Sequence, residues 1–261
     1  MTLFIVIVST LNNIMKEKET ICVWFSCGAA SAVAAKKTIE KYGSTHNVIV
    51  VNNPVVNEHK DNLRFLKDIE RWIGQKILFA TNPNFPSCDI VDVFEKRKYI
   101  SGVAGAPCTK FLKKEARYHF EKTNVIDWHV LGFTFDEKNR SDRFMKFERE
   151  NVIPILIDEN ITKGNCFDIL LDAEIKLPEI YKLGFPNANC IGCVKSQSPT
   201  YWNLVREKFP EVFKQRAEQS RRLGVKLVKY KGERIFLDEL EPTAKGGKIK
   251  SWECGIFCDT E

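Results

Sequence analysis

Cysteines and small polar residues mark the positions at which this chain could do chemistry. Cys190 and Cys193 are spaced C-x-x-C in a Gly- and Asn-rich segment, where two thiolates can converge on one metal ion or redox partner. The segment Ser26–Ser31, SCGAAS, lies between an apolar run and an alanine-rich stretch. Such a turn directs backbone N–H groups and a helix dipole at one point, which suits a phosphate or sulfate. The same small residues would also let a helix pack closely on a strand, and that alternative stays open.

A parallel sheet would bring these positions together. Ile21–Phe25 and Asn47–Val51 each predict a buried strand, and the helix between them completes a βαβ unit. Because ligands of parallel sheets bind beyond the carboxyl ends of the strands, Asn52 and Asn53 are expected beside the Ser26 turn. The fold class is therefore α/β. Further strands are expected at Lys76–Ala80, Asp127–Gly132 and Val152–Ile157, and helices at Asp61–Ile73, Phe167–Glu174 and Pro199–Leu223 with a break at Pro210.

Length and composition are those of a soluble globular protein. The 261 residues suffice for one large domain with an appendage, and the net charge of +6 suits an anionic small molecule or weak contact with nucleic acid. Nine cysteines in a reducing compartment predict core thiols, metal ligands or redox groups. The apolar run Leu3–Val8 is too short to span a bilayer, so a cytoplasmic protein without membrane contact is expected. The expected units are an N-terminal extension (1–18), a nucleotide-binding α/β domain (19–185), and a Cys-x-x-Cys loop with helices and tail packed on it (186–261).

Several stretches, in chain order, resemble the sulfonucleotide reductases, the phosphoadenylyl-sulfate and adenylyl-sulfate reductases of the adenine nucleotide alpha-hydrolase group. SCGAAS resembles the modified phosphate loop of that family. GFTFDEKNR, Gly132–Arg140, is similar to G-x-R-x-D-E-S-x-R, with Thr134 in place of arginine. Residues 177–193 resemble L-P-x-x-Y-x-x-G-[FY]-x-x-x-x-C-x-x-C, and WECGIF at 252–257 is similar to E-C-G-[IL]-H, with Phe257 in place of histidine.

The resemblance implies a twisted parallel sheet with helices on both faces and a Cys-containing C-terminal extension. It implies a nucleotide site formed by Ser26, Cys27, Gly28, Ala29, Ala30, Ser31, Asn53, Lys110, Gly132 and Arg140. A four-iron four-sulfur cluster is implied as cofactor, with zinc or a bare dithiol as alternatives. Its ligands would be Cys108, Cys190 and Cys193, with Cys258, Cys254 or an exogenous sulfide in the fourth position.

The reaction implied is attack by the Cys254 thiolate on the sulfur of (3′-phospho)adenylyl sulfate. An adenine nucleotide leaves, and thioredoxin or glutaredoxin then releases sulfite; a disulfide or ligand role for Cys254 with Cys258 is the rival interpretation. A second hypothesis is an enzyme that uses ATP and Mg²⁺ to adenylate a nucleobase or tRNA and insert sulfur. A third is a non-catalytic binding module, and a homodimer is compatible with each. If the chain is a non-catalytic binding module, nucleic-acid phosphates would contact Lys245, Lys248, Lys250, Arg216, Arg221 and Arg222.

Overall fold

The central element of the fold is a four-stranded sheet whose strands all run in the same direction. The computed structural model describes residues 18–102, 105–247 and 249. The strands have the order β3-β2-β1-β4, and each neighbouring pair is parallel. The predicted α/β class with a parallel sheet is therefore confirmed. The strands are β1 (Thr20–Phe25), β2 (Asn47–Asn52), β3 (Ile77–Phe79) and β4 (Trp128–Val130).

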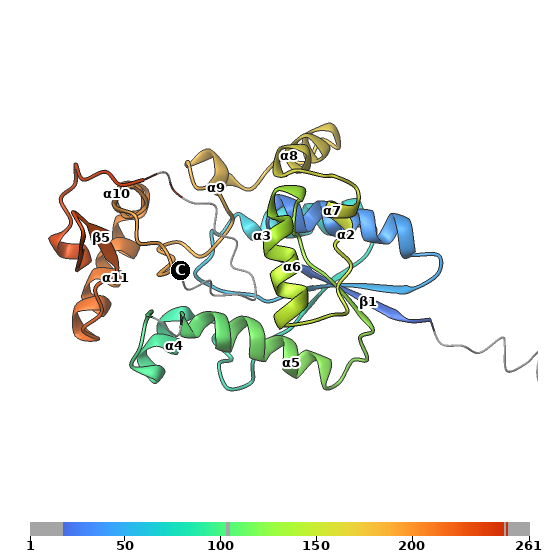
Figure 1. Cartoon of the computed structure of the whole chain (residues 1–261), viewed down its shortest axis with the longest axis horizontal. Coiled ribbons are helices and arrows are strands. Elements are labelled where there is room, and N and C mark those ends of the chain that lie inside the picture. Colours follow the sequence, from blue (N-terminus) through green and yellow to red (C-terminus); the bar gives the residue numbers. More distant parts are fainter. Residues whose placement is uncertain (1–17, 103–104, 248, 250–261) are drawn as a thin grey trace, which may run out of the picture.

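Helices cover both faces of the sheet, which explains why β1 is continuously apolar instead of alternating. Ile21 and Val23 belong to the core cluster on one face, and Cys22 and Trp24 to the cluster on the other. The small side chains of α2 let it lie directly against β1, so that Ala32 is fully buried. The first face is covered by α2 (Ala29–Tyr42), α3 (Asn62–Ile73), α7 (Ile155–Asp158) and α8 (Lys163–Asp172), and the second by α5 (Glu115–Glu121) and α6 (Lys138–Phe147) (Figure 1).

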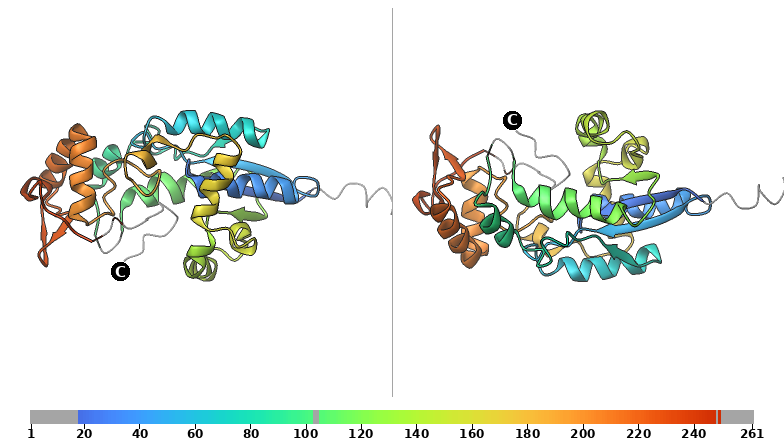
Figure 2. Two further views of the ribbon diagram at one scale, coloured as in Figure 1. Left: turned by 90° about the horizontal axis from the view of Figure 1, so that it is seen from above. Right: turned by 90° about the horizontal axis from the view of Figure 1, so that it is seen from below.

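A second apolar core forms a lobe at the end of the molecule far from the start of β1 (Figure 2). Trp202 lies at its centre with no exposed surface, and its indole N–H donates to the Ser196 carbonyl at 2.8 Å. Pro199 and Pro210 each occupy the first turn of a helix, where their missing N–H costs nothing. The lobe contains α4 (Ile90–Arg97), α10 (Pro199–Lys208), α11 (Pro210–Arg222), β5 (Val228–Tyr230), β6 (Glu233–Ile235) and η3 (Leu237–Glu239).

Shorter elements link the sheet to this lobe. The π-helix η1 (Thr109–Lys114) runs directly into α5, and the 3-10 helix η2 (Phe135–Glu137) runs into α6. The single-turn helix α9 (Glu179–Lys182) precedes the C-x-x-C segment.

The strand expected at Val152–Ile157 is wrong. Only Val152 pairs with the sheet, through a single parallel bridge to His129, and the chain then forms α7. Pro154 has no N–H for a strand ladder, whereas it fits the start of a helix. Ile155 and Leu156 are buried by the helix, so a short apolar run could not reveal which structure it would adopt.

Several regular elements were not anticipated from the sequence, among them α4 within the Pro- and Asn-rich region, α6 after β4, and the β5–β6 hairpin. The predicted helix with a break at Pro210 is confirmed as α10 and α11. Residues 1–17 of the predicted N-terminal extension, and the residues Cys254 and Cys258, lie outside the described part of the chain. Within residues 18–102, 105–247 and 249, no helix has both the length and the apolar composition needed to cross a bilayer.

Candidate functional site

The turn between β1 and α2 is organised by the Ser31 hydroxyl. Ser31 Oγ accepts hydrogen bonds from the backbone N–H and the hydroxyl of Ser26, each at 3.1 Å, and donates to the Gly28 carbonyl at 2.9 Å. Ser31 is 2% exposed, whereas Ser26 is exposed. Ser31 therefore holds the shape of the turn, and Ser26 is the hydroxyl that faces outward.

Cys27 contributes backbone shape to the turn. Its φ of 57° lies in the left-handed region, which is uncommon for a residue with a side chain. The side chain is buried in the core, where Asn52 Nδ2 lies 3.7 Å from its sulfur. Burial raises the pKa of the Cys27 thiol, so the group stays protonated and unreactive at neutral pH.

The N-terminus of α2 lies at this turn and is approached by two other segments. Gly28 caps the helix without a side-chain hydrogen bond. The Ala29 N–H donates to the Tyr181 hydroxyl at 3.3 Å, and Tyr181 comes from α9. From the other side, Gly132 packs so closely that a Cβ there would lie 2.8 Å from the Ser31 nitrogen. The exits of β1 and β4 therefore meet at the helix end, as a βαβ sheet requires.

A hollow of about 640 Å³ opens in front of this turn, and we name it the turn pocket. Three of the side chains around it are cations, and no carboxylate is among its lining residues within the described ranges. Such a charge distribution favours an anionic ligand. The pocket is lined by Trp24, Phe25, Ser26, Gly28, Asn53, Lys113, Arg117, Leu131, Gly132, Phe133, Arg140, Tyr181, Asn187, Ala188 and Asn189.

Two of the cations, Lys113 and Arg117, contact buried polar groups. The Lys113 ammonium, on a side chain 6% exposed, lies 3.4 Å from Glu58 Oε1 and 3.3 Å from the Asn53 carbonyl. Arg117 Nε donates to the Asn53 side-chain oxygen at 3.2 Å. Burial raises the pKa of the Glu58 carboxyl, and the Lys113 charge acts in the opposite direction. The third cation, Arg140, lies 2.5 Å from Glu137 Oε1.

Trp24 forms an aromatic wall of the turn pocket and is fixed by a buried histidine. Its indole N–H donates to His129 Nδ1 at 3.1 Å, and Arg149 Nη1 lies 2.6 Å from the other ring nitrogen. Burial, reinforced by the charges of Arg149 and Arg117, lowers the pKa of His129 to about 3. The histidine is therefore neutral at physiological pH. The Arg117 guanidinium lies over the Trp24 ring at 5.2 Å from its centroid.

The structure brings half of the predicted nucleotide site to the turn pocket. Lys110 is not among these residues, because it is exposed with its amine over the Phe111 ring. Lys113 lines the pocket in its place, and Arg117 four residues later lies on the same face. The predicted residues that line the pocket are Ser26, Gly28, Asn53, Gly132 and Arg140; Cys27, Ala29, Ala30 and Ser31 form the buried turn and helix start behind it.

A second hollow, of about 390 Å³, adjoins the turn pocket and contains two cysteines; we name it the thiol pocket. Asn187 and Asn189 line both pockets, so one short segment forms their shared wall. The thiol pocket is lined by Ile180, Phe185, Pro186, Asn187, Asn189, Cys190, Ile191, Cys193, Ser196, Tyr201 and Ile249.

Buried polar groups support the C-x-x-C segment. The Cys193 N–H donates to the Tyr201 hydroxyl at 2.7 Å, and burial raises the pKa of Tyr201 well above its usual range. Arg216 is 1% exposed, and this burial lowers its pKa. Negative charge on Cys108, Cys190 or Cys193 would act in the opposite direction and raise the pKa of Arg216. The three predicted cysteine ligands that the structure describes therefore lie within electrostatic range of one buried guanidinium.

The three thiols do not form a site for a single metal ion within the described ranges. Across the residues that the structure describes, no group of three or more His, Cys, Asp or Glu side chains is arranged to hold a metal ion. The other candidate ligands, Cys254 and Cys258, lie outside those residues. The iron–sulfur and zinc assignments stay predictions, and we derive no chemical step through a metal.

Comparisons with known proteins do not show which family this chain belongs to. No protein-family model matches the sequence, and no curated protein matches it either. Among solved structures, the chain is similar to the U34-tRNA thiolase NcsA from Methanococcus maripaludis with its [4Fe-4S] cluster. The identity is 12%, the match covers 81% of this chain and 71% of that one, and the TM-score is 0.43. At that TM-score the likeness carries no argument. The fold and the site define an α/β protein with a pocket at a strand–helix turn that three cationic side chains line.

Proposed function

We propose that this chain is an adenine-nucleotide-dependent enzyme that inserts sulfur into a nucleobase of RNA. The observation that carries the proposal is the wall shared by the turn pocket and the thiol pocket at Asn187 and Asn189. A nucleotide in the first pocket and a cysteine in the second would be separated by a single short segment. Sulfur chemistry on a nucleotide-activated substrate needs this proximity.

Binding of a nucleotide is supported by the composition of the turn pocket. Lys113, Arg117 and Arg140 supply positive charge for a polyphosphate, and the lining also includes the aromatic residues Trp24 and Phe133. The helix end at Gly28 adds backbone N–H donors for a phosphate oxygen.

The proposed reaction has two stages. A carbonyl oxygen of the base attacks the α-phosphate of ATP, so that pyrophosphate leaves and the oxygen carries AMP. A persulfide on Cys190, charged by a persulfide donor, then attacks the activated carbon, and AMP leaves with the oxygen. The Cys193 thiolate attacks the Cys190 sulfur of the resulting disulfide, which leaves one sulfur on the base. A dithiol of the thioredoxin class reduces the Cys190–Cys193 disulfide and supplies the two electrons.

The proposal is tested with purified protein, ATP and Mg²⁺, a persulfide donor and unmodified RNA. We expect AMP to form together with nucleosides in which sulfur replaces oxygen, as detected by mass spectrometry. Arg140→Ala should weaken ATP binding, whereas Cys190→Ser should bind ATP normally and form no thiolated nucleoside. Lys110→Ala, outside the pocket, is the matched control for the charge and should behave as the wild type. Failure of the wild type to bind ATP would overturn the proposal.

The same assay separates this reaction from sulfonucleotide reduction. The reduction implied by the sequence depends on Cys254, which lies outside the described residues. Adenylyl sulfate and its 3′-phosphate are therefore included as substrates. Release of sulfite that survives Cys190→Ser and is lost in Cys254→Ser would count against sulfur insertion and for the reductase.

A further inference from the structure

The β5–β6 hairpin places two cations directly opposite each other. The strands are antiparallel, and Lys229 is the cross-strand partner of Arg234. Both side chains are exposed. The connecting turn, Lys231-Gly232, has φ values of 50° and 89°, which is the left-handed geometry of a tight two-residue hairpin. Like charges in direct opposition destabilise a strand pair, so this arrangement is more favourable when an anion neutralises them.

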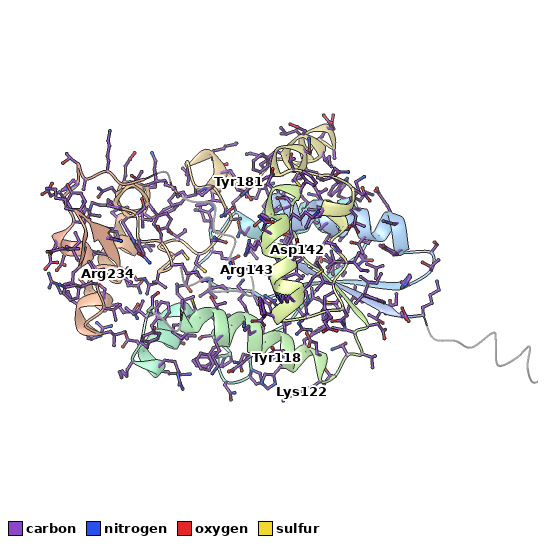
Figure 3. The ribbon with its side chains drawn as sticks, viewed as in Figure 1. Tyr118, Lys122, Asp142, Arg143, Tyr181 and Arg234 are labelled. Carbon is purple, nitrogen blue, oxygen red and sulfur yellow. The ribbon has the colours of Figure 1, made fainter. Side chains whose placement is uncertain are left out.

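The outer face of the hairpin is basic along its whole length. Lys226, Lys229, Lys231 and Arg234 are all exposed, and Glu233 is the single acidic residue between positions 226 and 235. Within the described ranges, none of the four cations forms an ion pair. We use the name basic hairpin for residues 226–235. Figure 3 shows Arg234 on the lobe, far from Lys122 at the end of α5.

The three arginines expected from the sequence to contact phosphates are not available for that role, because each is buried or already pairs with a carboxylate. Arg216 is buried. Arg221 pairs with Asp238 at 2.8 Å, and Arg222 pairs with Glu95. These arginines stabilise the lobe, so the exposed basic residues of the hairpin are better placed to meet a polyanion. Of the other three candidates, Lys245 is exposed, and Lys248 and Lys250 lie outside the described residues.

The hairpin is anchored on its inner face to the segment that follows the C-x-x-C cysteines. Val228 has no exposed surface and Leu227 is 2% exposed, so this face packs on the lobe. The Lys229 N–H donates to the Gln197 carbonyl at 2.9 Å, and Gln197 is four residues after Cys193. With one face packed and strands of three residues, the hairpin cannot enter a duplex groove, but it can contact phosphates from outside.

We propose that the basic hairpin binds the phosphate backbone of RNA and thereby delivers an unpaired base to the thiol pocket. The choice of RNA rests on the proposed function, because a base that reacts in a pocket must be unstacked, and unpaired loop bases are characteristic of RNA. Backbone contacts of this kind position the strand and carry no sequence information. Recognition of the target base would then belong to the thiol pocket.

The test measures binding of a fluorescent tRNA transcript by anisotropy, without nucleotide, from about 50 to about 200 mM KCl. In the double variant Lys229→Glu/Arg234→Glu we expect affinity to fall about tenfold or more and the salt slope of log K to decrease by about 1.4, the value for two lost single-strand phosphate contacts. The matched control is Lys41→Glu/Lys122→Glu, which reverses two exposed cations elsewhere on the molecule. This control should leave both quantities near wild type.

Each other outcome contradicts the proposal in its own way. Equal losses in the hairpin variant and the control would mean that net charge alone attracts RNA. Unchanged RNA binding in the hairpin variant, or equal affinity for a blunt DNA duplex or for vesicles containing phosphatidylserine, would also overturn it. A failure of the proposed function would look different, because ATP binding or sulfur insertion would be absent while the hairpin-dependent RNA binding persisted.

Discussion

Substitution of Gly132 by alanine tests whether β4 and α2 meet as closely as the turn pocket requires. Gly132 follows β4 and faces the first turn of α2. A Cβ at this position would lie 2.8 Å from Ser31 N, 3.0 Å from Ser31 Cα and 3.1 Å from the Ala30 carbonyl carbon. All three atoms belong to the helix backbone, so no side chain can rotate away to relieve the overlap. The helix itself has to move.

The cost follows from this geometry. The contacts fall several tenths of an ångström below ordinary van der Waals distances, and overpacking of this kind typically costs about 1–3 kcal/mol. For a chain of this size we expect the melting temperature to fall by about 2–10 °C. Because Ser31 holds the Ser26 turn through its hydroxyl, displacement of the helix should also weaken nucleotide binding.

The assay combines differential scanning calorimetry with titration of ATP on Gly132→Ala and on a matched control. The control is Gly164→Ala, because a Cβ at Gly164 would meet only the Thr162 hydroxyl oxygen at 3.7 Å. Gly164 lies in α8, where alanine is favoured over glycine by up to about 1 kcal/mol. The control should therefore be as stable as the wild type or slightly more so. A Gly132→Ala protein with wild-type melting temperature and ATP affinity would refute the close approach.

Three further substitutions test the surroundings of the turn pocket. Tyr181→Phe removes the hydroxyl that accepts the first N–H of α2, so a phosphate no longer has to displace it; we expect ATP affinity by calorimetry to rise about fivefold, corresponding to about 1 kcal/mol. Lys113→Met leaves Glu58 buried without its counter-charge and should lower the free energy of unfolding in urea by about 3–5 kcal/mol, whereas Lys110→Met should leave it unchanged. His129 takes up a proton in the unfolded chain below pH 6.5, but in the folded chain only near its pKa of about 3. The stability of the wild type should therefore fall with decreasing pH by up to about 1.4 kcal/mol per pH unit. His129→Gln should show a shallower fall between pH 6.5 and 5.

The backbone of the site follows from local sequence, which is why it could be predicted. An apolar run, a turn of small residues, a helix and a second apolar run force a right-handed parallel βαβ unit. That topology alone places Asn53 beside Ser26 and Gly28, and all three line the turn pocket. The exit of the fourth strand at Gly132 follows by the same reasoning. These positions depend on sequence order and strand direction, both of which can be read from the chain.

Which of these neighbouring basic residues line the pocket depends on the angular position of each residue around its helix. The sequence does not determine that position. Lys110, Lys113, Lys114 and Arg117 are close together, and their spacing does not reveal which of them face the sheet. The segment starts as the π-helix η1, whose wider turn changes the angular position of each side chain from that of a regular α-helix. Lys113 and Arg117 consequently face Asn53, and Lys110 faces solvent.

The shared wall between the two pockets is a tertiary contact between separate cores. The turn pocket lies at the carboxyl edge of the sheet, and the thiol pocket lies in the lobe built from α10 and α11. Tyr181 packs against both core clusters, and its hydroxyl accepts a hydrogen bond from the Ala29 N–H at the start of α2. Any movement of the lobe relative to the sheet therefore alters the donor that a nucleotide phosphate would use. Chemistry that transfers sulfur across Asn187 and Asn189 would thus be coupled, through Tyr181, to occupancy of the turn pocket.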